Sequence, residues 1–312
     1  MGTPDFAVPS LERLGQSPHD LVWVVSRPDR RKGRGLELTT PPVKEAAVRM
    51  GLTVQQPESF DDPTFLASLR KLNADLFVVV AFVILPRSIL EIPKLGSVNL
   101  HPSLLPGYRG AAPMQWAIIR GERETGLTTF ILRSKVDAGD ILIQRRVRID
   151  ADETYGGLHD RLKLLGADVV LETVDGLAAG QVIPRPQTEV GVSRAPKLER
   201  EDARIDWHQD AVSIRNLIRG TNPIPGAFTD WSGGVLKVYR AAVRSEGGAP
   251  GEVLFADARE GIVVAAGAGS LRLEEVQPSG KRRMSGDAFV RGQQISSGGR
   301  MGRANGNEAA DL

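Results

Sequence analysis

The chain has 312 residues, a length that suits two domains with room for a sizeable core. Hydrophobic residues make up 41% and charged residues 25%, ordinary values for a soluble globular protein, and the net charge of +2 excludes a nucleic-acid role that rests on overall charge. The absence of cysteine excludes disulfides and thiolate ligands, and the four histidines are too dispersed for a structural zinc site. Since we find neither an apolar run of the roughly 18 residues that a membrane helix needs nor a signal peptide, we expect a cytoplasmic protein.

The first part of the chain alternates predicted helices with predicted strands. We predict helices at 10–14, 43–50, 63–72 and 87–91, and strands at 21–25, 52–54 and 76–85. The run at 76–85 is the most apolar segment and is the expected central strand, because Val and Phe are enriched and Pro86 follows. No strand is expected before the first helix. This alternation predicts a parallel, right-handed βαβ sheet.

A basic segment, residues 26–35, follows the first predicted strand. Five of its positions are positively charged against a single Asp29, which suits contact with phosphate. Gly33 and Gly35 do not make a dinucleotide-binding motif, because the third glycine and the following helix are missing. A solvated surface loop is the simplest alternative, although a long structureless loop within a compact domain is uncommon unless it has a function.

A strand with two polar side chains near its end is predicted at residues 98–101. Asn99 and His101 lie two positions apart, which places both side chains on one face of an extended chain. Prolines and glycines then interrupt regular structure until Pro113, which suits the first position of a helix. The pair therefore lies where a strand gives way to a loop, the position at which open α/β sheets bind ligands.

A carboxylate is expected to reach the same edge of the sheet. Asp137 lies in a turn between predicted strands at 128–132 and 141–149. An amide can donate to a developing oxyanion while an imidazole exchanges protons, as acyl transfer between nitrogens requires, and a carboxylate would orient the imidazole. A hydrogen-bonded structural histidine is the alternative interpretation of His101. Ser103 is not surrounded by the Gly-x-Ser-x-Gly motif of serine hydrolases.

The second part of the chain has a different pattern of predicted elements. A long helix with an apolar stripe is predicted at 157–177, and another helix at 211–219. Short strands predicted at 236–242, 251–255, 261–265 and 271–276 suggest a small barrel. We therefore predict a catalytic domain over 1–180, a linker over 181–205, a C-terminal domain over 206–295 and a disordered tail over 296–312.

Several motifs together resemble the methionyl-tRNA formyltransferases, within the superfamily of formyltetrahydrofolate-dependent formyltransferases. They are Gly-Thr-Pro-Asp-Phe-Ala at 2–7, the basic segment, Asn-Leu-His-Pro-Ser-Leu-Leu-Pro at 99–106, Asp-Ala-Gly-Asp at 137–140, Arg-Ile-Asp-Trp at 204–207 and Gln-Pro-Ser-Gly-Lys at 277–281. The resemblance extends in order from residue 1 to about residue 292. It implies an α/β fold: a Rossmann-like, mostly parallel sheet in a formyltransferase domain, followed by a small C-terminal β-barrel that resembles an OB-fold and binds tRNA.

The resemblance also implies a reaction and a set of site residues. The formyl group of 10-formyltetrahydrofolate, the co-substrate, would pass to the α-amino group of methionine on initiator tRNA, for translation initiation, with no metal and in a monomeric enzyme. The implied catalytic residues are Asn99, His101 and Asp137, and the implied folate-binding residues are Phe82, Ser103, Leu104, Leu105 and Pro106. The implied tRNA-binding residues are Arg30, Arg31, Lys32, Arg34, Lys281 and Arg282.

The chain departs from the family pattern at three places, one of which is Arg133, where relatives often carry an acid, and two other reactions stay open. The first strand of the family's sheet is expected to be missing, and the segment around Phe82, which lies against the pterin in the family, is one glycine short. Relatives that formylate a nucleotide-sugar amine or glycinamide ribonucleotide share the Asn-x-His motif and the aspartate. Hydrolysis of 10-formyltetrahydrofolate would use the same three catalytic residues.

Overall fold

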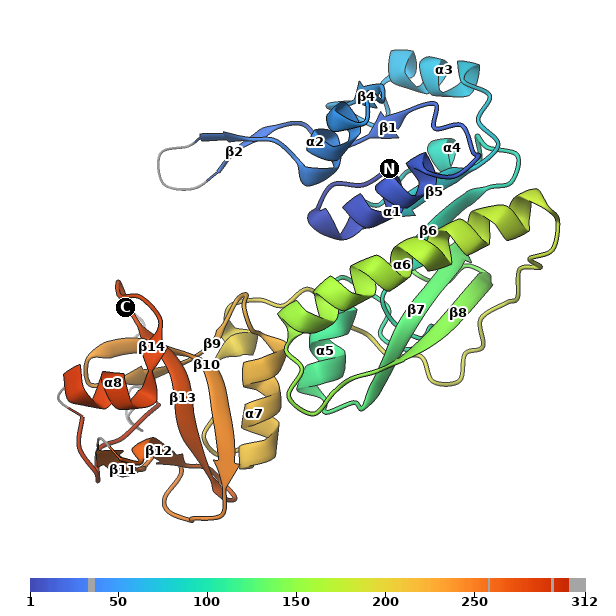
Figure 1. Cartoon of the computed structure of the whole chain (residues 1–312). Coiled ribbons are helices and arrows are strands. Elements are labelled where there is room, and N and C mark those ends of the chain that lie inside the picture. The colour runs from blue at the N-terminus through green and yellow to red at the C-terminus, as the bar shows by residue number, and fades with distance from the viewer. Residues whose placement is uncertain (33–36, 258, 293–294, 303–312) are drawn as a thin grey trace, which may run out of the picture. The chain divides into compact units, whose positions relative to one another are not determined.

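The structure, a computed structural model, describes residues 1–32, 37–257, 259–292 and 295–302, and the chain divides into two compact units (Figure 1). Unit 1 contains Met1–Pro113, Glu124–Arg148 and Leu158–Pro196. Unit 2 contains Met114–Arg123, Ile149–Gly157 and the chain from Lys197 onward. Residues 181–196, which the sequence analysis assigned to a linker, cluster with unit 1. Among the described helices, none combines the length and apolar character needed to cross a membrane.

Unit 1 combines helices with short strands. Its helical elements are η1 (Asp5–Ala7), α1 (Val8–Gly15), α2 (Pro42–Arg49), α3 (Pro63–Lys71), α4 (Arg87–Leu90) and most of α6 (Tyr155–Ala178). Its strands are β1 (Val24–Val25), β2 (Arg30–Lys32), β3 (Glu37–Thr39), β4 (Val54–Gln55), β5 (Phe77–Val80), β6 (Ser97–His101), β7 (Glu124–Ile131) and β8 (Ile141–Arg148). The predicted helices and most of the predicted strands are therefore present, with shifted boundaries.

The sheets of unit 1 are mixed, which corrects the prediction of a mostly parallel sheet. β1 pairs with β4 in parallel, and β5, β6, β7 and β8 follow one another in a four-stranded sheet. Only the β5–β6 pair of that sheet is parallel, because β7 and β8 each run antiparallel to the strand before them. Residues 132–140, which connect β7 and β8, are fewer than the dozen or more that a crossover between parallel strands needs, so these two strands run antiparallel.

Two further predictions about strands are corrected. The expected central strand at 76–85 ends at Val80, because Ala81 adopts a left-handed backbone with φ of 48° that cannot continue a strand. The basic segment is not structureless, since β2 and β3 form an antiparallel ladder in which Arg30 pairs with Thr39 and Arg31 with Leu38.

Helix α6 covers the sheet that carries β6 (Figure 1). Within its apolar stripe, Leu158, Leu162, Val169 and Val170 are buried. At Gly166 the helix approaches the sheet so closely that a Cβ atom would lie 2.7 Å from Leu100 Cδ2. Such packing of a long helix against the β6 strand holds the end of β6 in place.

Unit 2 is built on an antiparallel sheet. Its strands are β9 (Ala227–Trp231), β10 (Gly234–Arg244), β11 (Val253–Asp257), β12 (Gly261–Ala265), β13 (Ser270–Pro278) and β14 (Met284–Ser285). Its helical elements are α5 (Pro113–Ile119, from Met114 onward), η2 (Glu201–Ala203), α7 (Ala211–Gly220) and α8 (Gly286–Gly292). The strand order is β11-β12-β13-β10-β9, with β14 paired to β13. Within the described part of the chain β9 and β11 end this order without pairing to each other, so the predicted barrel is observed as an open sheet.

Candidate active site

Strand β6 carries the two polar side chains singled out from the sequence. Val98 and Leu100, which share one face of the strand, are buried at 1% and 3% exposure. Asn99 is the partly exposed member of the strand, whereas His101, its last residue, is buried. The alternation of the strand places Asn99 and His101 on the same face, at the end where the chain enters the loop before α5.

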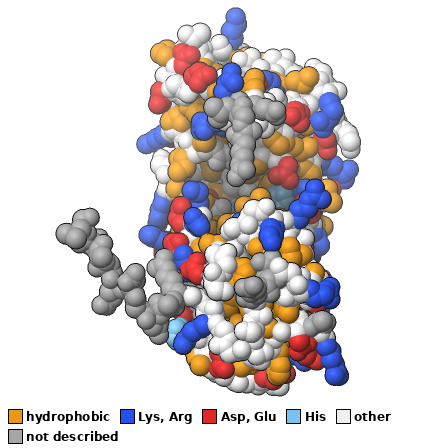
Figure 2. All heavy atoms as spheres, turned by 90° about the vertical axis from the view of Figure 1, so that its left-hand side faces the viewer, with side chains coloured by type: hydrophobic (Ala, Val, Ile, Leu, Met, Phe, Trp, Pro, Cys, Tyr) orange, Lys and Arg blue, Asp and Glu red, His pale blue; other side chains and the backbone are white. Residues whose placement is uncertain are grey.

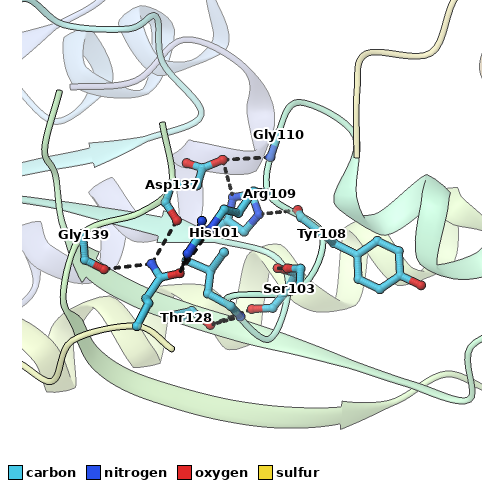
Figure 3. A network of polar contacts seen from close by, with 11 residues as sticks. His101, Ser103, Tyr108, Arg109, Gly110, Thr128, Asp137 and Gly139 are labelled. Carbon is cyan, nitrogen blue, oxygen red and sulfur yellow. Dashed lines mark hydrogen bonds and ion pairs between the residues drawn. The ribbon is translucent and has the colours of Figure 1, made fainter. Parts of the chain in front are cut away.

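The contacts of His101 determine which of its ring nitrogens can accept a proton. Nε2 lies 2.9 Å from the carbonyl oxygen of Tyr108, which only accepts hydrogen bonds, so Nε2 carries a proton. In the neutral ring Nδ1 is then unprotonated, and it faces Asp137 Oδ2 at 3.8 Å (Figure 3). The side chains of His101 and Asp137 are only 5% and 13% exposed. The carboxylate therefore lies where it stabilises a positive charge on the imidazole.

The turn after β7 places Asp137 at this position. Asp137 itself has a left-handed backbone with φ of 49°, and its Oδ2 accepts a hydrogen bond of 2.8 Å from the backbone N–H of Gly110. Gly139 passes so close to β7 that any side chain there would overlap the carbonyl oxygen of Ile131. The conformation of the turn is thus set by a glycine and by the hydrogen bond to the loop that follows His101.

Gln187 is a site residue that the sequence analysis missed. Its Nε2 donates to the carbonyl oxygens of Asp137 at 2.9 Å and Gly139 at 2.8 Å. Its Oε1 accepts from Arg109 Nη2 at 2.6 Å and Nε at 3.2 Å. One amide therefore joins the Asp137 turn to the loop that leaves β6. Its position in a polar, proline-bearing segment gave no local signal, because these partners lie 48 to 78 residues away.

The loop segment 103–106 is held by its own polar groups and by Thr128 of β7. Ser103 Oγ donates to the carbonyl oxygen of Gly107 at 2.7 Å, and Thr128 Oγ1 donates to the carbonyl oxygen of Ser103 at 2.6 Å (Figure 3). The Leu105 N–H donates to Thr128 Oγ1 at 3.2 Å. Ser103 and Leu105 are buried, whereas Leu104 and Pro106 are partly exposed. Leu104 and Pro106 are therefore the residues of this segment that can contact a ligand.

Phe82 lies beyond the end of β5, the strand next to β6. Its ring meets that of Phe60 edge to face, with centroids 5.5 Å apart. It is partly exposed, so one part of the ring is available to a ligand. Phe82 thus follows β5, and Asn99 and His101 lie in the neighbouring strand β6. Asp137 lies in the turn between β7 and β8 of the same sheet.

The basic residues lie elsewhere. Arg30 and Arg31 are exposed on β2 of unit 1, whereas Lys281 and Arg282 are exposed after β13 of unit 2. Arg34 lies outside the described residues, and for Lys32 only the backbone is described. In Figure 2, Lys and Arg side chains are interspersed with Asp and Glu, in keeping with the net charge of +2.

The charge of Asp29 is satisfied inside the protein. Hydrogen bonds from Gln56 and Lys44 hold the pKa of Asp29 below its usual range, and Lys44 Nζ lies 2.7 Å from its carboxylate. This carboxylate is therefore already paired at the base of the β2–β3 hairpin. Because Lys44 already neutralises Asp29, this carboxylate only partly offsets the positive charge of Arg30 and Arg31.

Comparisons with known proteins identify the family of the chain. The profile of the family described as "Formyl transferase" matches residues 1–174, and that of "Formyl transferase, C-terminal domain" matches residues 197–294. A methionyl-tRNA formyltransferase of Geobacter metallireducens is 48% identical over 303 residues, which is 97% of both chains. The enzyme of the same name from Caldanaerobacter subterraneus is 44% identical and covers 96% of this chain and 97% of its own.

Solved structures with a similar fold are also found. HypX from Aquifex aeolicus in complex with tetrahydrofolic acid superposes with a TM-score of 0.58 at 25% identity, over 80% of this chain and 43% of HypX. The sugar 3N-formyl transferase WlaRD reaches a TM-score of 0.62 at 19% identity, over 90% of this chain and 97% of its own, which shows the shared fold. The chain belongs to the formyl transferase family, among the methionyl-tRNA formyltransferases.

Proposed function

We propose that the chain transfers a formyl group from 10-formyltetrahydrofolate to the α-amino group of methionine on initiator tRNA, for translation initiation. Relatives of that name are 44–48% identical over nearly the whole chain. The observation that carries the chemistry is the position of His101 at the end of β6, with Nε2 at 2.9 Å from the Tyr108 carbonyl oxygen and Nδ1 at 3.8 Å from the Asp137 carboxylate. The proposal places the reaction in the cytoplasm, together with the tRNA.

The three catalytic residues of the proposal have separate tasks. In the reaction the amine nitrogen bonds to the formyl carbon, the bond from that carbon to the folate nitrogen breaks, and one proton moves from the amine to the folate nitrogen. His101 Nδ1 accepts that proton and returns it, while Asp137 balances the charge of the imidazolium. The amide of Asn99 donates to the formyl oxygen as negative charge develops there.

The folate-binding part of the proposal rests on segment 103–106 and Phe82. Leu104 and Pro106 are partly exposed, and the hydrogen bonds around Thr128 keep the backbone of the segment rigid. An apolar, rigid surface with a partly exposed ring suits a flat heteroaromatic group. Ser103 and Leu105, which are buried and hydrogen-bonded, support this surface from beneath.

The tRNA-binding part of the proposal rests on Arg30, Arg31, Lys32 and Arg34 in unit 1 and on Lys281 and Arg282 in unit 2. Guanidinium and ammonium groups bind phosphates by charge and hydrogen bonding. Arg30 and Arg31 are exposed on β2, and the neighbouring Asp29 is paired with Lys44. We further propose that unit 2 is an OB-fold-like module and that the chain acts as a monomer, which light scattering of the purified chain tests.

Formylation of methionyl initiator tRNA tests the proposed function. The purified chain is incubated with 10-formyltetrahydrofolate and charged tRNA, and formylmethionine is detected by mass spectrometry. Asp137→Asn keeps an acceptor for the Gly110 N–H but removes the charge, and should lower kcat by about 10² to 10⁴. Asp140→Asn is the matched control, because Asp140 lies in the same turn and forms an exposed ion pair with Arg133.

Two outcomes would contradict the proposal. Formylation of a nucleotide-sugar amine or of glycinamide ribonucleotide, with none of the tRNA, would assign another acceptor. Release of formate without any amine would assign hydrolysis. Equal activity of the Asp137→Asn and Asp140→Asn proteins would remove Asp137 from the catalytic set.

A further inference from the structure

The loop that leaves β6 is held by a short segment of unit 1, residues 193–195, which we call the strap. The loop and the strap run in parallel, with a bridge between Arg109 and Arg194. Arg109 N donates to the carbonyl oxygen of Ser193 at 2.9 Å, and Ala195 N donates to that of Arg109 at 2.8 Å. The strap therefore fixes the backbone of the loop from both sides of Arg109.

A glycine allows the strap to approach the loop this closely. At Gly110, where φ is 129°, a Cβ atom would overlap the carbonyl oxygen of Ala195. Any other residue at this position would push the two backbones apart. Ala195 itself is fully buried. The contact is therefore a tight backbone contact, which fixes the distance between the strap and the loop.

Tyr108 lies between two peptide groups that Ser193 binds. Tyr108 N donates to Ser193 Oγ at 2.8 Å, and the next N–H of the chain, that of Arg109, donates to the carbonyl oxygen of Ser193. Tyr108 has a left-handed backbone with φ of 59°, which a residue with a side chain rarely adopts. Because the peptide groups on both sides of its Cα are held, Tyr108 keeps this conformation.

The peptide group between Tyr108 and Arg109 joins the strap to His101. Its N–H donates to Ser193, and its carbonyl oxygen accepts a hydrogen bond of 2.9 Å from His101 Nε2 (Figure 3). The N–H and C=O of a trans peptide lie in one plane and point in opposite directions, so a rotation that moves one also moves the other. The contacts of Ser193 therefore set the position of the oxygen that faces the imidazole.

Two acceptors compete for the proton of the neutral His101 ring. The Tyr108 carbonyl oxygen is within hydrogen-bond distance of Nε2, whereas Asp137 Oδ2 lies 3.8 Å from Nδ1, beyond that distance. If the Tyr108 carbonyl turned away, the carboxylate would draw the proton to Nδ1, because the hydrogen bond of one ring nitrogen decides the role of the other. Nδ1 would then be unable to accept a proton from an amine.

We infer that Ser193 is a positioning residue: through the Tyr108 peptide it keeps the proton of neutral His101 on Nε2 and leaves Nδ1 as the acceptor. This inference rests on the proposed function, in which Nδ1 carries the proton from the amine to the folate nitrogen. Because Ser193 acts through Tyr108 and not on a substrate, its removal should change kcat and the state of the His101 ring, with little effect on KM.

Two variants of equal size test this inference. Ser193→Thr keeps the hydroxyl oxygen, and Ser193→Val has the same shape without it; the partial exposure of Ser193 leaves room for the added methyl group. Nitrogen chemical shifts of isotope-labelled histidine distinguish the Nε2–H from the Nδ1–H form at about pH 9, above the usual titration range of imidazole. The chain has four histidines, and the signals lost in His101→Gln identify those of His101.

Ser193→Val should shift the ratio of the two forms about fivefold or more toward Nδ1–H, as expected for the loss of one neutral hydrogen bond. It should also lower kcat about tenfold or more, with KM for both substrates changed less than about threefold. Ser193→Thr should match the unsubstituted chain in both measurements. Thr188→Val is the control, because the exposed Thr188 hydroxyl donates to the Val190 carbonyl oxygen and not to the loop.

The ratio of the two forms is measured without substrate, so it does not depend on which amine is formylated. An unchanged ratio in Ser193→Val overturns the inference even if kcat or Tm falls, since a merely structural role would have that effect. A shifted ratio with unchanged kcat overturns it as well. If the unsubstituted chain formylates no tRNA and the ratio still shifts, the proposed function fails while the control of the His101 ring by Ser193 is supported. Ser193→Ala, which removes the same oxygen and adds no atom, replaces Ser193→Val if that variant does not fold.

Discussion

Gln187 provides a sharp test of how the candidate site is held together. Gln187→Met keeps the length of the side chain and removes its hydrogen bonds to the Asp137 and Gly139 carbonyl oxygens and to Arg109. Gln187→Glu keeps the acceptor for Arg109 but directs a second anionic oxygen at the two carbonyls. Comparison of the two variants therefore separates the effect of the hydrogen bonds from Arg109 from that of the hydrogen bonds to the Asp137 turn.

The expected magnitudes follow from these contacts. A neutral hydrogen bond contributes about 1 kcal/mol and one from a charged donor about 2 kcal/mol. Partial exposure of Gln187 lets water replace some of them, so we expect Gln187→Met to lose about 2 kcal/mol, which lowers Tm by about 4–8 °C. A displacement of about 1 Å at a reacting group costs about 10² in rate, and kcat should fall by that factor.

Steady-state formylation kinetics and thermal unfolding together measure the effect. We expect kcat to fall about 100-fold in Gln187→Met, with KM for both substrates changed less than about threefold, because the residue positions Asp137 rather than a substrate. Gln187→Glu should lose kcat to a similar extent and should also lose stability, because its carboxylate cannot donate to the Asp137 and Gly139 carbonyl oxygens. The exposed Gln181→Met is the control. A Gln187→Met protein with unchanged kcat would refute the positioning role.

Three further predictions concern stability and tRNA binding. The free energy of unfolding should decrease by up to about 4 kcal/mol as the pH falls from 8 toward 5. The Met1 amine has a pKa of about 5 in the folded chain and of 8.0 when it is exposed to water, so over this range it is protonated only in the unfolded chain. An N-acetylated chain should lose this pH dependence in denaturant titrations. Ser103→Ala should cost about 1–3 kcal/mol in calorimetry, because its fully buried hydroxyl donates to the Gly107 carbonyl, whereas the exposed Ser134→Ala should cost almost nothing. Arg31→Ala should raise KM for tRNA several-fold at low salt and less at high salt, and an effect independent of salt would argue against a phosphate contact.

Local patterns determined the helices and the end of β6. α3 begins where Asp62 accepts a hydrogen bond from Thr64 N and is followed by Pro63, and α6 follows its apolar stripe. The spacing of Asn99 and His101 similarly placed both on one face of a strand. These features depend on neighbours within a few residues, so periodicity and capping residues are sufficient to predict them.

Tertiary structure decided what depends on distant partners. The antiparallel direction of β7 and β8, the early end of β5 at Ala81 and the ladder of β2 with β3 each depend on which strands pair, and apolar runs do not specify partners. The protonated nitrogen of His101 is set by the Tyr108 carbonyl, and the Asp137 turn is held by Gln187. A hydrogen bond between residues fifty positions apart leaves no periodic trace in the sequence, so only the folded chain shows how the residues of the motif become a site.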